Sequence, residues 1–156
     1  MYRLFTEFVG PPGAAALLLL RLVTGLAFML HGWSKIQHPF TWLGADSWAP
    51  GFLQAIAAFA EFGGGLSLIL GLLTPIACCG LVCVMTTAIV AVHLPKGDAF
   101  VGGQGGGSFE LPLVYLAVAL TLMWVGPGIY SLDNMLFKKK VAITPAPSET
   151  RTKAAV

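Results

Sequence analysis

The sequence predicts an all-α membrane protein, built as a bundle of four transmembrane helices. Of its 156 residues, 56% are hydrophobic and only 10% are charged, whereas a soluble domain carries roughly 25% charged residues. The charges are also segregated, because only eight lie between residues 8 and 137 while the last nineteen residues hold six. A water-soluble monomer is therefore excluded. One membrane domain over residues 1–137 fits the length, and we expect the basic tail, 138–156, to be disordered.

Four apolar stretches approach the roughly 20 residues that a helix needs to cross a bilayer. They cover residues 14–33, 52–73, 76–94 and 109–125. The first stretch contains Arg21 and lacks a small-residue cleavage pattern, so we expect a retained helix rather than a removed signal peptide. Only Thr74 and Pro75 separate the second and third stretches, which predicts a tight antiparallel hairpin.

Signals for helix boundaries surround the fourth stretch. Ser108 is a suitable N-cap and Glu110 lies in the first turn, where a negative charge is favourable. Gly126-Pro127-Gly128 ends the helix. Ser131 can then cap a short helix through Phe137, which we expect to lie on the inner membrane surface.

Lysine and arginine residues beside the spans predict the orientation. Lys138 to Lys140 directly follow the last helix and Arg3 precedes the first, so we expect a plasma-membrane protein with both termini in the cytoplasm. The two longer connections, residues 34–51 and 95–108, then face outward. The second contains the glycine run 102–107, which lacks the lysine and the preceding strand of a phosphate loop and is interpreted as a flexible loop.

Ionisable side chains inside the predicted spans cost about 2.5 to 3.5 kcal/mol each at the centre of a helix, so they need partners or a function. On the first helix we expect a stripe at 3-4-3-4 spacing to face the bundle. It consists of Arg21, Thr24, Phe28, His31 and Lys35. On the second helix Glu61 lies in a face of small residues and is expected to face another helix. On the third we expect a similar inward stripe, made of Cys79, Cys83, Thr86, Val90 and His93.

Depth along the helices, at ~1.5 Å per residue, places Arg21 and Glu61 near the middle of the membrane. Arg21 can reach a carboxylate about one turn away, so we predict an Arg21–Glu61 ion pair that relieves both desolvation penalties. Such a pair would also pin the first two helices together. The other ionisable residues lie in the outer half; they are His31, His93, Glu110 and, just above them, Lys35. Together with Glu61 they are expected to converge on one outward-opening pocket.

Three interpretations of this pocket stay open. Histidines and carboxylates could hold zinc, copper or iron, but His31 and His93 lie on separate helices without paired ligand spacing, so no metal is predicted. Protonatable groups beside an arginine could bind a quinone headgroup and exchange its protons, because histidine titrates near neutral pH. In the third interpretation the same groups only pair helices. Cys79 and Cys83, one turn apart, are interpreted as apolar filler.

Short motifs at fixed spacing run through almost the whole chain except its tail. The first helix carries Arg21-x-x-x-Gly25-x-x-Phe28-x-x-His31-Gly32-x-x-Lys35. The second carries Glu61-x-x-Gly64-Gly65-x-x-Leu68-x-x-Gly71-x-x-Thr74. They are followed by His93, Ser108-Phe109-Glu110 and Gly126-Pro127-Gly128-x-x-Ser131-x-Asp133. In order and spacing these motifs resemble the DoxX family of small four-helix membrane proteins.

The resemblance implies a compact bundle in the plasma membrane and, for some members, an association with quinone-linked oxidation of thiosulfate and with other redox systems. It also implies which positions would line a shared site. These are Arg21, His31, Lys35, Glu61, His93 and Glu110. Because we expect no soluble domain for a sulfur substrate in this chain, such an oxidation would need a partner subunit.

We therefore expect a membrane subunit of a quinone-linked oxidoreductase system, with quinone as the bound cofactor. Two alternatives stay open: a non-catalytic scaffold or assembly subunit of a larger membrane complex, and a binder of a small solute or lipid. Glycine-rich faces in so small a bundle predict a homo-oligomer or membership of a larger complex. Nucleic acid is not an expected partner, because the positive charge behind the net +2 lies in the tail rather than on a folded face.

Overall fold

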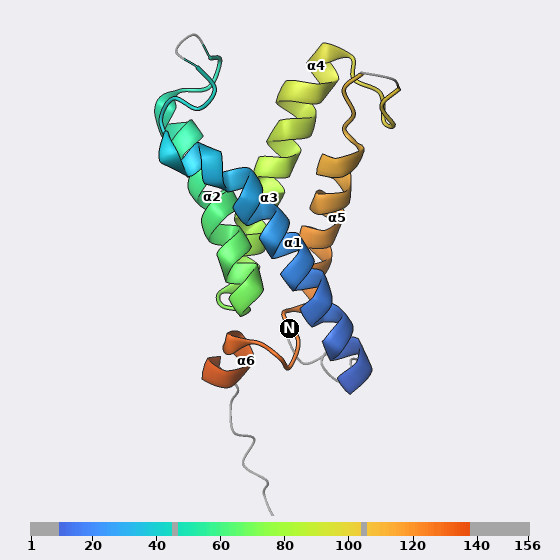
Figure 1. Ribbon diagram of the computed structural model, residues 1–156. Helices are drawn as coiled ribbons and strands as arrows, with labels where there is room; N and C mark the ends of the chain where they lie inside the picture. The colour runs from blue at the N-terminus through green and yellow to red at the C-terminus, as the bar shows by residue number, and fades with distance from the viewer. Residues whose placement is uncertain (1–9, 45–46, 104–105, 138–156) are drawn as a thin grey trace, which may run out of the picture.

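The computed structural model describes residues 10–44, 47–103 and 106–137, and their regular structure is helical apart from one isolated bridge (Figure 1). Within these residues the separate helices are α1 (Pro11–Gln37), α2 (Gly51–Leu70), α3 (Thr74–Thr87), α5 (Glu110–Val125) and α6 (Leu132–Phe137). A π-helical segment η1 (Ala88–His93) and the single turn α4 (Leu94–Lys96) prolong α3 without a break. Arg3, Lys138 to Lys140 and the predicted tail lie outside the described residues.

In the part of the chain that the structure describes, three helices are long and apolar enough to cross a membrane, namely Pro11–Gln37, Gly51–Leu70 and the combined Thr74–Lys96. Helix α5 is also apolar but, with 16 residues, it is shorter. All four lie within a few residues of the predicted stretches. Large apolar side chains such as Leu30, Phe59 and Trp124 are more than half exposed, which suits a surface in contact with lipid rather than water. The predicted class, an all-α membrane protein, is confirmed.

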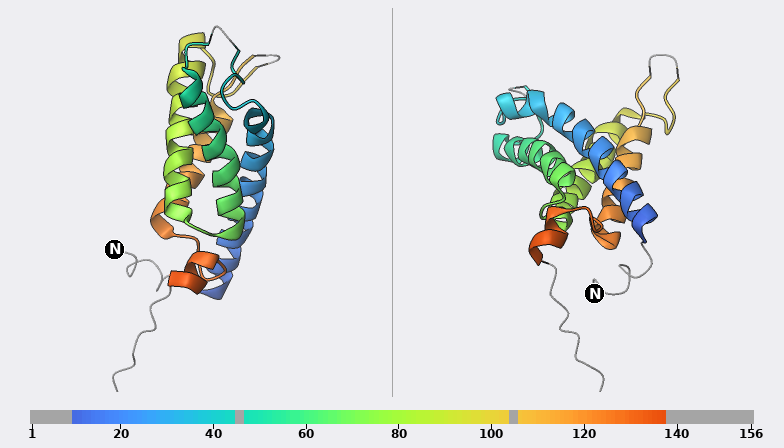
Figure 2. Two further views of the ribbon diagram at one scale, coloured as in Figure 1. Left: turned by 90° about the vertical axis from the view of Figure 1, so that its left-hand side faces the viewer. Right: turned by 60° about the horizontal axis from the view of Figure 1, so that its bottom comes forward.

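The helices pack in chain order, α1 along α2, α2 on α3 and α3 on α5, while α1 and α5 touch only over a short distance (Figures 1 and 2). Gly25 and Gly65 allow α1 and α2 to meet backbone to backbone, because a Cβ atom at Gly65 would lie 2.6 Å from the Gly25 carbonyl oxygen. Small residues at helix contacts have this role in membranes. The first helix begins and the last described residues end at the same end of the bundle, where α6 lies (Figure 1). We call this the α6 end and the opposite one the α4 end.

The core face of α3 differs from the predicted one. Cys78, Leu81 and Met85 are buried, whereas the predicted inward residues Cys79 and Cys83 are exposed, and so are Thr86 and Val90. The reason lies in α2, where Gly64 leaves a space that the large Leu81 side chain fills; a Cβ atom at Gly64 would lie 3.2 Å from Leu81 Cγ. Burial of an apolar leucine against a glycine fills this gap better than a small side chain does.

The turn between α2 and α3 is fastened to α6. Gly71 and Leu73 adopt left-handed backbone conformations, with φ of 65° and 51°, and α3 then begins at Thr74 with Pro75 in its first turn. The Asp133 carboxylate accepts hydrogen bonds from the backbone N–H groups of Leu73 and Thr74, at 2.7 and 2.9 Å. Asp133 thereby satisfies N–H groups at the start of α3 that have no partner within the helix. The predicted cap of α6 is also present, since Asn134 N–H donates to Ser131 Oγ at 3.1 Å.

Candidate functional site

A cavity of about 250 Å³ lies between the helices, in the half of the bundle nearer to α4. Every long helix contributes to its wall. The lining residues are Phe28, His31 and Lys35 of α1, Glu61 of α2, Met85, Ala88 and His93 of the α3–η1 helix, and Leu111, Pro112 and Tyr115 of α5. Four of the six predicted site residues therefore meet at one cavity.

Lys35 and Glu61 form an ion pair in the cavity wall. Lys35 Nζ lies 2.6 Å from both Oε1 and Oε2 of Glu61. The Glu61 side chain is 4% exposed and the Lys35 side chain 23%. Removing two such charges from water is costly, so each ion depends on the other for its remaining stabilisation.

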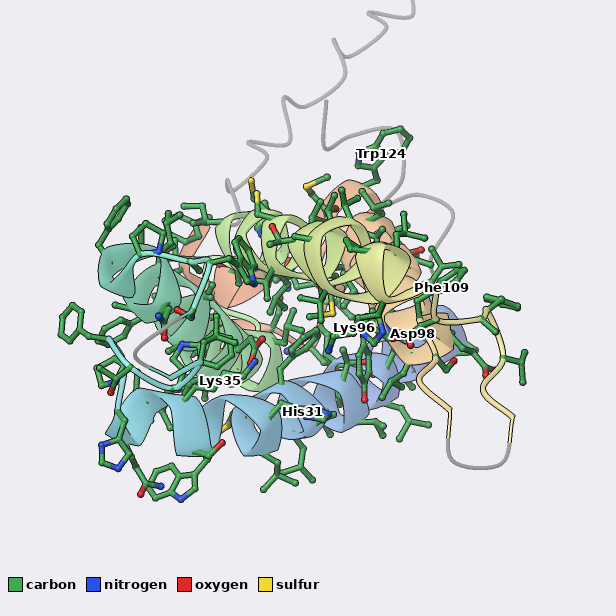
Figure 3. The ribbon with its side chains drawn as sticks, turned by 90° about the horizontal axis from the view of Figure 1, so that it is seen from above. His31, Lys35, Lys96, Asp98, Phe109 and Trp124 are labelled. Carbon is green, nitrogen blue, oxygen red and sulfur yellow. The ribbon has the colours of Figure 1, made fainter. Side chains whose placement is uncertain are left out.

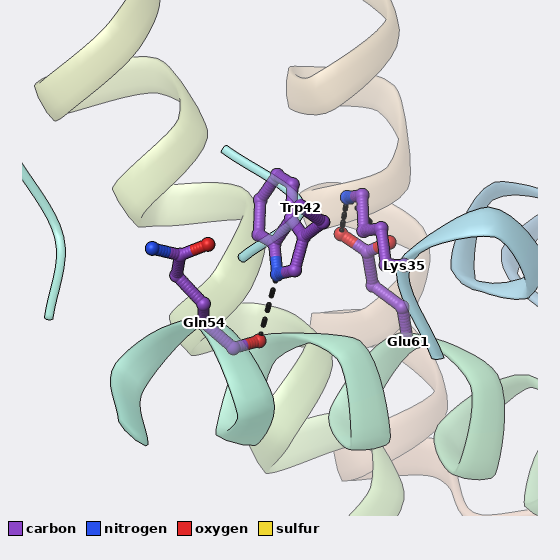
Figure 4. A network of polar contacts seen from close by, with 4 residues as sticks. All are labelled: Lys35, Trp42, Gln54 and Glu61. Atoms are coloured by element: carbon purple, nitrogen blue, oxygen red, sulfur yellow. Dashed lines mark hydrogen bonds and ion pairs between the residues drawn. The ribbon is translucent and has the colours of Figure 1, made fainter. Parts of the chain in front are cut away.

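The connection between α1 and α2 covers this ion pair (Figure 4). The Trp42 ring lies over the Lys35 ammonium, 4.5 Å from Nζ to the ring centroid, a favourable cation–π geometry. Trp42 Nε1–H donates to the Gln54 carbonyl oxygen at 2.9 Å. The buried Gln54 side chain in turn donates to Ser47 Oγ and to the Ala49 carbonyl oxygen. These bonds fix the connection to the start of α2 and hold Trp42 above Lys35.

The π-helical segment η1 brings His93 to the cavity. The inward face of the helix passes through Cys78, Leu81, Met85 and Ala88. A regular α-helix, with 3.6 residues per turn, would next place residue 92 on that face. The wider π turns accommodate one additional residue, and His93 takes the position instead. Pro95 favours this departure, because it has no N–H and its ring crowds the carbonyl four residues earlier.

His93 is oriented by a carboxylate from the following loop. Its Nδ1 lies 2.8 Å from Asp98 Oδ2, because the left-handed Gly97, with φ of 71°, turns the chain back toward the helix. This contact leaves Nε2 as the second polar atom of the imidazole ring. Asp98 was not among the predicted site residues. The signal that could have found it is a carboxylate five residues after the histidine, across a glycine turn.

His31 lines the cavity from α1. It is an exposed residue, and its ring meets Tyr115 edge-on at a centroid distance of 6.3 Å. Tyr115 also packs on Phe28, at 4.9 Å between ring centroids. In the view from the α4 end, Lys35 and Asp98 lie toward the middle of the bundle, whereas Trp124 points away from it (Figure 3).

The predicted Arg21–Glu61 ion pair is wrong. Arg21 is 1% exposed and lies toward the α6 end, where its guanidinium donates to backbone carbonyl oxygens at 2.6 to 3.3 Å. The acceptors are Leu68, Ile69, Pro127 and Tyr130. The helices α1 and α2 are antiparallel and cross at Gly25 and Gly65. Arg21 precedes Gly25 in α1 and therefore lies beside residues that follow Gly65 in α2, whereas Glu61 lies on the other side of the crossing.

Glu110 also lies outside the cavity wall. Its side chain is exposed, and its backbone N–H donates to Ser108 Oγ at 3.1 Å, although the N-cap residue of α5 is Phe109 and not the predicted Ser108. Metal binding would need several ligands close together. Across residues 10–44, 47–103 and 106–137, no three His, Cys, Asp or Glu side chains are near enough to one another to hold a metal ion.

Comparison with known proteins adds the evolutionary relationship. The DoxX family model matches residues 16–94. An uncharacterized protein of Haemophilus influenzae is 34% identical over 122 residues, which cover 77% of this chain and 90% of that protein. The inner membrane protein YqjF of Escherichia coli is 30% identical over 133 residues, 78% of this chain and 92% of that protein.

A third relative, from Bacillus subtilis, bears the name "Putative oxidoreductase CatD" and is 30% identical over 126 residues, which cover 79% of this chain and 88% of that protein. No solved structure matches the chain at a comparable level of significance. The family match and these near full-length relationships agree with the long apolar helices of this chain. The chain belongs to the DoxX family of membrane proteins.

Proposed function

We propose that this protein is the membrane subunit of a quinone-linked oxidoreductase system and that its cavity binds the quinone headgroup. The observation that carries the proposal is the Lys35–Glu61 ion pair, which shares one cavity with His31 and His93. Ionisable groups among membrane-spanning helices are costly and are functional sites by default. The name of the Bacillus subtilis relative, that of an oxidoreductase, agrees with a redox role.

The cavity suits a flat ring with polar groups at its edge. Its volume of about 250 Å³ lies below the roughly 300–1,000 Å³ of pockets for drug-sized ligands, which fits a headgroup without its isoprenoid tail. Phe28, Met85 and Leu111 provide apolar walls for the ring. The tail leaves the bundle between α1 and α5, which touch only over a short distance.

A bound quinone supplies two-electron, two-proton redox chemistry. His93, held at Nδ1 by Asp98, hydrogen-bonds the ligand through Nε2 and exchanges a proton with it. Glu61 can accept the second proton, and Lys35 compensates its charge in the deprotonated state. This chain holds the ring and its protons, and the partner subunit carries the electrons.

The membrane topology is part of the proposal. Helix α5, with 16 residues, crosses as the fourth span, and both termini lie in the cytoplasm, because Lys138 to Lys140 follow the last span. The cavity then lies in the outer half of the plasma membrane. The chain works as a homo-oligomer or within a larger membrane complex, since a bundle of this size offers little surface for substrate oxidation on its own.

Extraction of the full chain from its native membrane in mild detergent tests the proposal. Mass spectrometry of the eluted complex should identify a quinone and a redox subunit. The quinone should be lost from a Glu61→Gln variant and retained by Glu110→Gln, because Glu110 is outside the cavity wall. A bundle that elutes with neither quinone nor redox protein would overturn the proposal and favour the scaffold or solute-binding alternatives.

A further inference from the structure

A second hollow adjoins the cavity at Lys35. It has a volume of about 400 Å³ and is lined by Ser34, Lys35, His38, Thr41 and Trp42. Ser34, His38 and Thr41 are exposed, so this hollow opens at the surface of the α4 end. Lys35 lines both spaces, the surface hollow and the cavity between the helices.

Lys35 is held in the partition between these two spaces by two contacts. The Glu61 carboxylate binds its ammonium from α2, and the Trp42 ring covers it from the α1–α2 connection. Within the described residues, all hydrogen bonds of the Lys35 side chain go to Glu61. The ammonium therefore keeps its position in the partition through the negative charge of one carboxylate and the cover of one aromatic ring.

We propose that Lys35 and Trp42 form a gate between the cavity and the surface hollow, and that loss of the Glu61 charge opens it. When Glu61 takes up a proton, the attraction that holds the ammonium is lost. The long, flexible lysine side chain then extends into the hollow, where water solvates its charge. Water reaches the cavity through the space that Lys35 leaves.

The other titratable groups around Glu61 do not replace it as the ionic partner that holds Lys35 in place. His31 of α1, His93 of η1 and Tyr115 of α5 share the cavity wall, and among residues 10–44, 47–103 and 106–137 Lys35 alone forms an ion pair with Glu61. The inference deepens the proposed function, on which it rests for the source of the proton. When the bound ligand transfers a proton to Glu61, the gate opens, and the proton can then leave the cavity through the surface hollow.

Cysteine accessibility tests the gate without any quinone. In a background with Cys78, Cys79 and Cys83 changed to alanine, Ala88→Cys places one thiol in the cavity wall. Its reaction with a cationic, membrane-impermeant methanethiosulfonate is followed in lipid nanodiscs. Glu61→Gln should accelerate this reaction by about tenfold or more, the change expected for roughly 1.4 kcal/mol. Removal of the Glu61 charge would by itself slow a cationic reagent, so acceleration identifies opening.

Two controls separate opening from general loosening. Glu110→Gln should leave the rate at Ala88→Cys unchanged, since Glu110 is exposed and outside both spaces. A thiol introduced by Ala119→Cys, at a core position that is 1% exposed, should stay unreactive in every variant. An unchanged rate at Ala88→Cys in Glu61→Gln overturns the gate.

If Glu61→Gln loosens the fold, the thiol of Ala119→Cys will react as well, and this variant then cannot test the gate. A second variant, in the α1–α2 connection, tests it in that case. Trp42→Ala removes the cover of Lys35 without touching the ion pair. If Trp42→Ala accelerates the reaction at Ala88→Cys and leaves Ala119→Cys unreactive, the gate is supported. An unchanged rate at Ala88→Cys overturns it. Because no ligand is present, failure of the gate and failure of quinone binding are distinguishable.

Discussion

The ammonium of Lys35 lies 2.6 Å from both carboxylate oxygens of Glu61, although 26 residues separate them in sequence. Gly32 of α1 meets the backbone of Phe62 in α2, and this close approach, three residues before Lys35 and one after Glu61, brings the two side chains together. Neither charge has another ionic partner in the described part of the chain. The same two residues thus link α1 to α2 and line the cavity.

The first prediction concerns the energy of this ion pair. Lys35→Met leaves the Glu61 carboxylate buried and unpaired, and should lower the free energy of unfolding by about 2 kcal/mol, less than for a fully buried pair because Lys35 is 23% exposed. The double change Lys35→Met with Glu61→Leu should restore most of the loss, since apolar residues can replace a buried pair. Thermal unfolding in detergent measures both. Equal losses in the single and double variants would contradict the pairing.

The second prediction separates Arg21 from that pair. Arg21 donates to carbonyl oxygens of two different segments, a geometry that the planar guanidinium provides and an ammonium does not. Arg21→Lys should therefore lower stability nearly as much as Arg21→Met, by about 3 kcal/mol. Thermal unfolding compares the two variants. A lysine variant as stable as the reference protein would mean that only the positive charge of Arg21 matters.

The third prediction uses two neighbouring glycines of α2. A Cβ atom at Gly65 would lie 2.6 Å from the Gly25 carbonyl oxygen, whereas one at Gly63 would meet nothing within 4 Å. Gly65→Ala should destabilise the bundle by about 1–3 kcal/mol through overpacking. The matched change Gly63→Ala should stabilise it by about 0.5–1 kcal/mol, because alanine favours a helix. The same sign for both variants would show that α1 and α2 do not meet so closely.

The fourth prediction concerns the register of the third membrane helix. Because η1 holds one residue more than an α-helix would, deletion of the exposed Val90 should convert the segment to α-helix and keep the histidine at the cavity. Deletion of the exposed Cys83 should instead rotate the residues between it and η1 by about 100° and move Met85 out of the core. Thermal unfolding should therefore show a stable protein only after the first deletion. Equal tolerance of both deletions would argue against a π segment.

The sequence predicts the helices well because lipid leaves few alternatives. A long apolar run must satisfy its own backbone in a bilayer, and a helix is the simplest solution. The convergence of His31, Lys35, Glu61 and His93 was also predictable, from helical spacing and depth along the spans. Both arguments need only the order of residues along each helix.

The partners of individual polar residues were not predictable in this way. Arg21 binds backbone carbonyl oxygens, which every residue possesses and which therefore leave no pattern in the sequence. Its separation from Glu61 follows from where α1 and α2 cross, and the predicted depths did not include that crossing. The inward face of α3 depends on the space beside Gly64, and the position of His93 on the extra residue in η1. Each of these requires the packed structure.

Quinone binding is the central claim, and Trp42 provides its probe. A water-soluble short-chain quinone is titrated into the protein in nanodiscs, with Trp33, Trp48 and Trp124 changed to phenylalanine so that quenching reports on Trp42 beside Lys35. Quenching should saturate, and His93→Ala or Glu61→Gln should weaken binding by about tenfold or more, as loss of one charged hydrogen bond implies. Glu110→Gln should bind as the reference protein does. Absence of saturable quenching, or equal affinity in all variants, would contradict a quinone site in this cavity.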